Sequence, residues 1–214
     1  MKTRSPLVLL VALQLFATAA IGSAEPRVNG AGCACCAKSK APGEFTDRSL
    51  YQVGSVWTDD AARPVRLGSL KGRPQIITMF FANCQYACPV LVHDMKRIEQ
   101  ALPENVRTNV GFVLVSFDSK RDTVDALRDY RTRNDLNMNR WTLLRGEPDD
   151  VLELAALLGV NFKQGADGQF AHSNIITLLN ADGEIVHRQI GLNGDASQTV
   201  RIITQLLGRP GATP

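Results

Sequence analysis

The chain has 214 residues, with 24 Lys and Arg against 21 Asp and Glu, and its formal net charge is only +3. This near-neutral balance gives no case for nucleic-acid binding, which needs a strongly basic surface. The cysteines form two tight clusters, Cys33, Cys35 and Cys36 and then Cys84 and Cys88. A disulfide framework spreads its cysteines along a small domain, so the clustering favours redox or metal chemistry instead.

The first 24 residues have the pattern of an export signal. Lys2 and Arg4 precede an apolar run from Leu7 to Ala20, and small residues at 22–24 form a typical cleavage site. The run is a little short for a membrane span of roughly 20 residues, so we favour cleavage over the alternative of a retained membrane anchor. Either outcome predicts an exported protein, periplasmic or attached to the outer face of the inner membrane.

The next segment, residues 25–44, is rich in Gly, Ala, Pro and Lys and lacks apolar periodicity, which predicts a flexible tail that contains three cysteines. We expect the folded domain to span residues 45–208 and residues 209–214 to form a C-terminal tail. The domain should begin with a short hairpin, whose strands lie near 54–57 and 65–67.

Two apolar runs rich in β-forming residues, at 75–81 and 110–117, predict strands that are buried on both faces. Between them, apolar residues recur at helical spacing from Leu91 to Leu102, and Pro103 ends the predicted helix. The later predicted elements are a helix over 121–133, a short strand at 143–144, a helix over 149–158 closed by Gly159, two strands over 174–180 and 184–190 joined by a hairpin turn, and a last helix ended by Gly208.

Strands that alternate with helices imply a parallel central sheet flanked by helices, to which the late hairpin adds an antiparallel portion. We therefore predict an α/β fold of thioredoxin-like layout, with a central mixed sheet flanked by helices and an N-terminal hairpin extension. Sites in open α/β sheets form beyond the carboxyl ends of the strands. The segment after the strand at 75–81 is such a place.

That segment contains two thiols, Cys84 and Cys88, between a buried strand and a helix. Pro89 is tolerated in a first helical turn, so the thiols should lie near the positive end of the helix dipole, which favours thiolate. Thiolate is both a nucleophile and a metal ligand. The spacing is one residue wider than the Cys-x-x-Cys of thioredoxin-type redox sites, which leaves more freedom to surround a metal, although a disulfide is feasible.

A distant histidine completes the candidate site. His172 precedes the strand at 174–180, in the loop where thioredoxins usually place a cis-proline and where this chain has no proline. Two thiolates and one imidazole suit copper, as Cu(I) or Cu(II), and would also accept zinc. The alternative for His172 is a partly exposed loop residue in a hydrogen-bonded turn. His93, within the first predicted helix, is expected to lie on the surface.

Three segments resemble the motifs of the Sco/SenC family in the same order along the chain. They are Phe80–Pro89 (FFANCQYACP), Val115–Thr123 (VSFDSKRDT) and Phe170–Ser173 (FAHS). Members of this family are thioredoxin-like copper chaperones that assist assembly of the dinuclear copper centre of cytochrome c oxidase.

The resemblance implies copper ligands at Cys84, Cys88 and His172. It also implies a supporting role for Asp118 or Asp122, in partner docking or in positioning groups around the site. The alternative for Asp122 and its neighbour Arg121 is helix capping and a surface ion pair. The implied partner is a copper-receiving protein, namely subunit II of cytochrome c oxidase.

Two functions compete. A metallochaperone carries copper and turns over no substrate, whereas a thiol–disulfide oxidoreductase would act on partner cysteines through Cys84 and Cys88. A thiol peroxidase is a weaker third option, since no activating arginine motif is visible. The tail cysteines Cys33, Cys35 and Cys36 are interpreted either as an auxiliary arm that binds Cu(I) or as a local or intermolecular disulfide.

Overall fold

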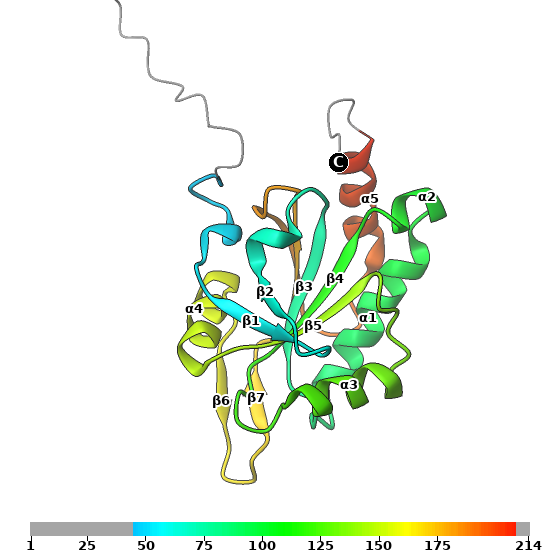
Figure 1. The fold of residues 1–214 in the computed structure, drawn as a ribbon. Helices are drawn as coiled ribbons and strands as arrows, with labels where there is room; N and C mark the ends of the chain where they lie inside the picture. The colour runs from blue at the N-terminus through cyan, green and yellow to red at the C-terminus, as the bar shows by residue number, and fades with distance from the viewer. Residues whose placement is uncertain (1–44, 209–214) are drawn as a thin grey trace, which may run out of the picture. The chain divides into compact units, whose positions relative to one another are not determined.

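A computed structural model describes residues 45–208, so the predicted export segment, the cysteine-containing tail over 25–44 and the C-terminal residues 209–214 lie outside the described part. The described residues form a seven-stranded mixed sheet with helices on both faces and a separate two-stranded sheet (Figure 1). In chain order the elements are η1 (Leu50–Gln52), β1 (Val56–Asp59), β2 (Pro64–Arg66), η2 (Leu67–Leu70), β3 (Gln75–Phe80), α1 (Ala87–Ala101), α2 (Glu104–Arg107), β4 (Gly111–Ser116), α3 (Val124–Arg133), β5 (Trp141–Arg145), α4 (Pro148–Leu158), β6 (Phe162–Gln164), β7 (Phe170–His172), β8 (Ile175–Leu179), β9 (Ile185–Ile190) and α5 (Ala196–Leu207).

The main sheet has the strand order β2-β1-β5-β4-β3-β8-β9. Its parallel part is β3, β4 and β5, while β8 runs antiparallel to β3 and β9 antiparallel to β8. Every residue of β3, β4 and β8 is buried, and the continuous apolar runs predicted this for β3 and β4. The predicted α/β fold with a mixed central sheet is therefore confirmed.

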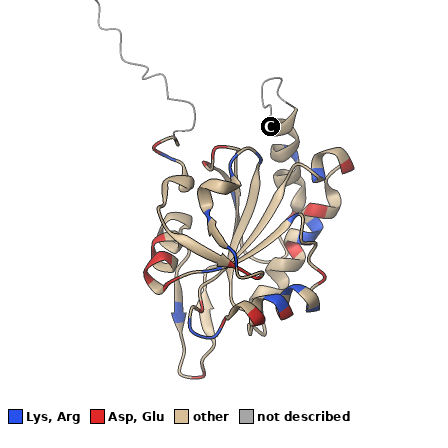
Figure 2. Cartoon of the chain, in the orientation of Figure 1, with Lys and Arg blue, Asp and Glu red and all other residues tan. Residues whose placement is uncertain are grey.

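The two faces of this sheet are covered by different numbers of helices. Helices α1, α3 and α5 lie on one face, and α4 lies on the other together with the segment that precedes β1 (Figure 1). Figure 2 shows charged residues along α1 and α3, and acidic residues gathered on α4. Within the described residues, no helix combines the length and the apolar character that crossing a membrane requires.

The predicted N-terminal hairpin is present as β1 and β2, and it extends the main sheet because β1 also pairs antiparallel with β5. A buried ion pair ties the turn of this hairpin to α3. The Arg131 guanidinium forms a two-point contact with the Asp60 carboxylate, and both side chains are at most 10% exposed. Arg131 also donates to the carbonyl oxygens of Leu136 and Trp141, so its buried donors are satisfied.

Helix α3 and the strands β6 and β7 differ from the sequence-based prediction. Helix α3 begins at Val124 instead of 121, because the Thr123 hydroxyl caps it by accepting a hydrogen bond from the Ala126 amide at 3.2 Å. The strands β6 and β7 were not predicted, since each has only three residues and neither shows an alternating apolar pattern. They form the two-stranded sheet.

Candidate metal site

The two thiols lie where β3 ends and α1 begins. Cys88 is fully buried in the first turn of α1, and Cys84 is half-buried in the loop before it. The Cys88 backbone amide donates to the Cys84 sulfur at 3.3 Å, so this sulfur serves as an acceptor at the helix N-terminus, where Tyr86 provides no side-chain cap. Within the described part of the chain, both cysteines are free thiols.

His172 approaches these thiols from a different element. It is the last residue of β7, so the prediction of a loop at this position was wrong, although its expected proximity to the cysteines is confirmed. The Nδ1–H group of His172 donates to the Ser173 carbonyl at 3.1 Å, which leaves Nε2 as the free ring nitrogen. Nε2 lies 3.6 Å from the Cys88 sulfur.

The donor atoms of Cys84, Cys88 and His172 all lie within 4.8 Å of one another. Two sulfurs and one imidazole nitrogen at these separations can hold one metal ion, and such donors favour copper or zinc. Because Cys84 is half-exposed, the site is reachable from solvent. Three protein donors also leave a coordination position for a further ligand.

The two thiols are in different electrostatic states. A hydrogen bond from Cys88 lowers the pKa of Cys84 from its ordinary value to about 4, with further help from His172 and nearby backbone amides, although burial opposes the shift. The same hydrogen bond, together with burial, raises the pKa of Cys88. Burial lowers the pKa of His172, but its contacts with Cys84 and the Ser173 carbonyl outweigh this and raise it. Cys84 is therefore the thiolate of the pair.

Asp122 lies beneath the site and is fully buried. One of its carboxylate oxygens accepts hydrogen bonds from the Ala82 amide at 2.8 Å and from the Ser116 hydroxyl at 2.5 Å. It thereby links the chain just after β3, which leads to Cys84, to the end of β4. The alternative of a capping residue in a surface ion pair is wrong for Asp122, because Thr123 caps α3 and Arg121 pairs with Asp118.

A cluster of aromatic rings surrounds His172, and sequence reasoning missed it. The Phe117 ring lies 5.2 Å from the imidazole and stacks on Phe162 at 4.9 Å, while Phe81 and Phe170 pack edge-on at 5.1 Å. Phe81, Phe117 and Phe170 each lie inside one of the three motifs. This recurrence is the feature of the sequence from which the cluster could have been found.

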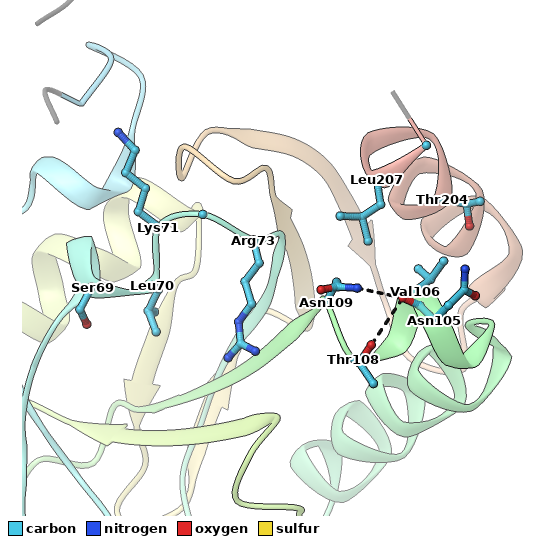
Figure 3. Close-up of a pocket in the computed structure, with 12 residues that line it drawn as sticks. Ser69, Leu70, Lys71, Arg73, Asn105, Val106, Thr108, Asn109, Thr204 and Leu207 are labelled. Carbon is cyan, nitrogen blue, oxygen red and sulfur yellow. Dashed lines mark hydrogen bonds between the residues drawn. The ribbon is translucent and has the colours of Figure 1, made fainter. Parts of the chain in front are cut away.

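Two other histidines lie away from this centre. His93 is exposed on α1, as predicted, and His187 lies in β9. The tail cysteines Cys33, Cys35 and Cys36 lie outside the described residues. A cavity of about 890 Å³ is lined by residues that precede β3, residues that precede β4 and the end of α5. It therefore lies at the opposite end of the strands from the thiols, and it contains no cysteine, histidine or carboxylate side chain (Figure 3).

A thioredoxin-like domain with two thiols at the start of its first long helix and an imidazole beside them defines a class of metal- or dithiol-handling proteins. The chain belongs to the SCO1/SenC family, whose sequence profile matches residues 52–208.

The descriptions of similar proteins name copper or the Sco family. A Stutzerimonas stutzeri protein whose assigned name describes copper binding is 29% identical over 168 residues, which cover 75% of this chain and 78% of that protein. The copper-bound structure of Arabidopsis thaliana ScoI has a TM-score of 0.63 at 21% identity and covers 72% of this chain and 96% of its own. A structure of BsSco, described as a member of the Sco family of cytochrome c oxidase assembly proteins with a disulfide switch, has a TM-score of 0.62 at 19% identity and covers 72% and 92%.

Proposed function

We propose that this protein is an exported metallochaperone that binds copper through Cys84, Cys88 and His172. It delivers copper to the dinuclear copper site of cytochrome c oxidase, or prepares that site to receive it. The observation that carries the proposal is the convergence of three donor atoms within 4.8 Å, from a loop, a helix and a separate hairpin. Family membership and the copper-bound relatives of the same fold support copper as the cargo.

The test is a Cu(I) titration of the reduced protein against a chromophoric chelator. Loss of an outer-shell partner typically weakens a metal site 10–100-fold, so Cys84→Ser and His172→Ala should each weaken binding by about 100-fold or more. His93→Ala is the matched control, because this exposed histidine should leave the affinity unchanged. Equal affinities in wild type and both ligand variants would contradict the proposal. A parallel titration with Cu(II) identifies the oxidation state that the site prefers.

Delivery to the oxidase is tested with the acceptor itself. The copper-loaded protein is mixed with the soluble copper domain of oxidase subunit II, and the absorption of the dinuclear centre is followed. Transfer should be seen with wild type and the His93→Ala control and be lost with Cys84→Ser. If the wild-type protein retains its copper, subunit II is not the acceptor.

A second candidate function is favoured by the contrast between the two thiols. A half-exposed thiolate at Cys84 beside a buried, protonated Cys88 is the arrangement of an attacking and a resolving thiol in disulfide exchange. As a reductant, the pair would attack a partner disulfide, form a Cys84–Cys88 disulfide and leave the partner with two thiols. This activity should survive His172→Ala, whereas copper binding should not, and the variant therefore separates the two roles.

Export is proposed from the N-terminal sequence alone. Residues 1–24 combine a basic start, an apolar run and a small-residue cleavage site. Cell fractionation with N-terminal sequencing of the mature protein tests both the location and the cleavage. A cytoplasmic protein would overturn the proposal, while an intact N-terminus in the membrane fraction would identify a retained anchor.

The auxiliary role of the tail cysteines is a separate proposal. If Cys33, Cys35 and Cys36 form a Cu(I)-binding arm, changing all three to serine should lower the copper stoichiometry and leave the affinity of the Cys84, Cys88 and His172 site unchanged. An unchanged stoichiometry would exclude the arm.

A further inference from the structure

The hairpin that carries His172 is separate from the main sheet. Strands β6 and β7 pair only with each other among the described residues, with Phe162 opposite His172 and Gln164 opposite Phe170. An isolated two-stranded hairpin is at best marginally stable in water. Besides the backbone that leads from β7 into β8, the position of the imidazole therefore depends on side-chain contacts that hold this hairpin against the rest of the domain.

One side chain from another part of the chain connects the hairpin to the rest of the domain. Arg121, in the segment between β4 and α3, donates from Nη2 to the Gly168 carbonyl in the turn of the hairpin at 2.5 Å. Its Nε donates to the Asp118 carboxylate, which is only 4% exposed. The planar guanidinium thus joins a buried acid of the core to the backbone of the hairpin through a forked set of donors.

The same guanidinium also covers the aromatic cluster. Its central carbon lies 5.6 Å from the centre of the Phe170 ring in β7 and 5.9 Å from the centre of the Phe81 ring just after β3. Contacts between a guanidinium and an aromatic ring at such distances are attractive, and they strengthen when they are desolvated. One ring belongs to the hairpin and the other to the segment that leads to Cys84, so Arg121 contacts both of these segments.

Gly168 is suited to this approach in two ways. Its φ of +77° is a left-handed conformation that favours glycine, and a Cβ added there would lie 3.0 Å from Nη1 of Arg121. A side chain at this position would both strain the turn and push against the guanidinium. Glycine at this position therefore favours the close approach of Arg121 to the turn.

We propose that Arg121 is a positioning residue for His172. Its contacts with Asp118, Gly168 and the two rings hold β6 and β7 so that the imidazole stays beside the thiols when copper is absent. The inference rests on the proposed copper site for its consequence, but the restraint on the hairpin is a property of the apoprotein. Arg121 acts through the hairpin and touches neither the thiols nor the metal position.

The first test needs no copper. Amide hydrogen exchange is measured by NMR on the reduced full chain for wild type, Arg121→Gln and Gly168→Ala. Both substitutions should accelerate exchange of the β6 and β7 amides about 10-fold or more, while the amides of β3 and β4 keep their wild-type rates. Unchanged exchange in the hairpin would overturn the proposal.

Matched controls separate the restraint that Arg121 places on the hairpin from general effects of the substitutions. Arg128→Gln removes an arginine that pairs with Asp125 on the exposed face of α3. Gly72→Ala strains a glycine of φ +104° that has nothing within 4 Å of its added Cβ. Both controls should leave hairpin exchange unchanged, and a control that reproduces the Arg121→Gln effect would contradict the specific role of Arg121.

The second test measures coupling to the histidine. Arg121→Gln should weaken Cu(I) binding about 10-fold in the wild-type background, the range typical of groups that orient a ligand, and should cause no further loss in the His172→Ala background. Arg121→Lys retains the charge but cannot reach both partners, so it should restore only part of the affinity. Equal losses in both backgrounds would overturn the proposal. A wild-type protein that binds no copper would overturn the proposed function instead. The exchange measurement would still show whether Arg121 restrains the β6–β7 hairpin.

Discussion

Cys84 and Cys88 share one hydrogen bond and yet differ in solvent exposure and in pKa, the two properties that control thiol reactivity. Cys84 is half-exposed with its pKa lowered to about 4, whereas Cys88 is buried with a raised pKa. A thiolate that is available to incoming copper or to a partner disulfide thus lies beside a thiol that is protected inside α1. The asymmetry follows from their places in the chain, one before the helix and one within its first turn.

This difference predicts the pattern of alkylation. At pH 6, iodoacetamide should modify Cys84 at nearly the rate seen at pH 8, because its thiolate is already formed, and it should leave Cys88 unmodified. Peptide mass spectrometry reports each site and separates both from the tail cysteines. Cys88→Ala should shift the pH midpoint of Cys84 modification upward, since the hydrogen bond from Cys88 is the largest cause of the lowered pKa. A midpoint near the ordinary thiol value in wild type would contradict this assignment.

Asp122 predicts a pH dependence of stability. Burial raises its pKa above 3.8, so the folded state binds this proton more tightly than the unfolded state does. The contribution of Asp122 to the free energy of unfolding should therefore be greatest below pH 3.8 and should fall as the pH rises through its folded pKa.

Denaturant unfolding of wild type and Asp122→Asn across this pH range measures the effect. The decline should be absent in Asp122→Asn, whose side chain does not titrate. Below pH 3.8, Asp122→Ala should cost about 2–4 kcal/mol, because the Ala82 amide and the Ser116 hydroxyl lose their buried acceptor, and this cost should shrink as the pH rises. Identical pH profiles for wild type and Asp122→Asn would contradict the raised pKa.

At the scale of elements, the metal site combines segments that are packed into the core with a hairpin that is not part of the main sheet. Helix α1 and strands β3 and β4 are packed into the core, so Cys88 lies in a buried helix, and Cys84 and Asp122 lie in loops that follow buried strands. The β6–β7 hairpin is held by rings and by Arg121. The histidine is therefore the ligand whose position responds most to changes outside the site.

The N-terminal hairpin is attached by the buried pair of Asp60 and Arg131. Arg131→Met should destabilise the domain by about 3–5 kcal/mol, because it leaves the Asp60 carboxylate buried without its partner. Asp60→Asn tests the other half of the pair and should also be destabilising. Urea unfolding provides the measurement, with Arg128→Met in the exposed Asp125 pair as the control, expected to change stability by less than about 1 kcal/mol. Similar effects of the two arginine substitutions would show that the buried pair contributes no more to stability than the exposed pair.

At the scale of the whole molecule, the hydrophobic core is complete without a metal. The central strands and the inner faces of the helices are buried together in one cluster, and the copper site lies at one end of the sheet. The apoprotein should therefore be folded, and copper should raise its stability by binding the native state. At free copper 1,000 times above Kd, the expected gain is about 4 kcal/mol.

Calorimetry with and without Cu(I) checks this prediction. Wild type and His93→Ala should show the same rise in Tm, and His172→Ala should show a smaller one. A reduced apoprotein that unfolds without metal would contradict the view that the core forms independently of the site.

The sequence alone was sufficient for the main elements. Continuous apolar runs predicted β3 and β4, helical spacing predicted α1, and the placement of two thiols between them located the site. These features depend on burial and on short-range periodicity, and both can be recognised from residues that are close together in the sequence. The copper ligands were implied by family resemblance, which supplied the link between segments that are far apart.

Only the tertiary structure decided the contacts between distant polar and aromatic groups. The partners Cys88 and His172 are 84 positions apart, Asp60 and Arg131 are 71 apart, and Arg121 and Gly168 are 47 apart. No local pattern encodes these pairs, because hydrogen bonds and ion pairs depend on where separate elements come to lie after the chain has packed. The β6–β7 hairpin escaped prediction for the same reason, since its strands are too short and polar to carry a periodicity and are held in place by residues from elsewhere in the fold.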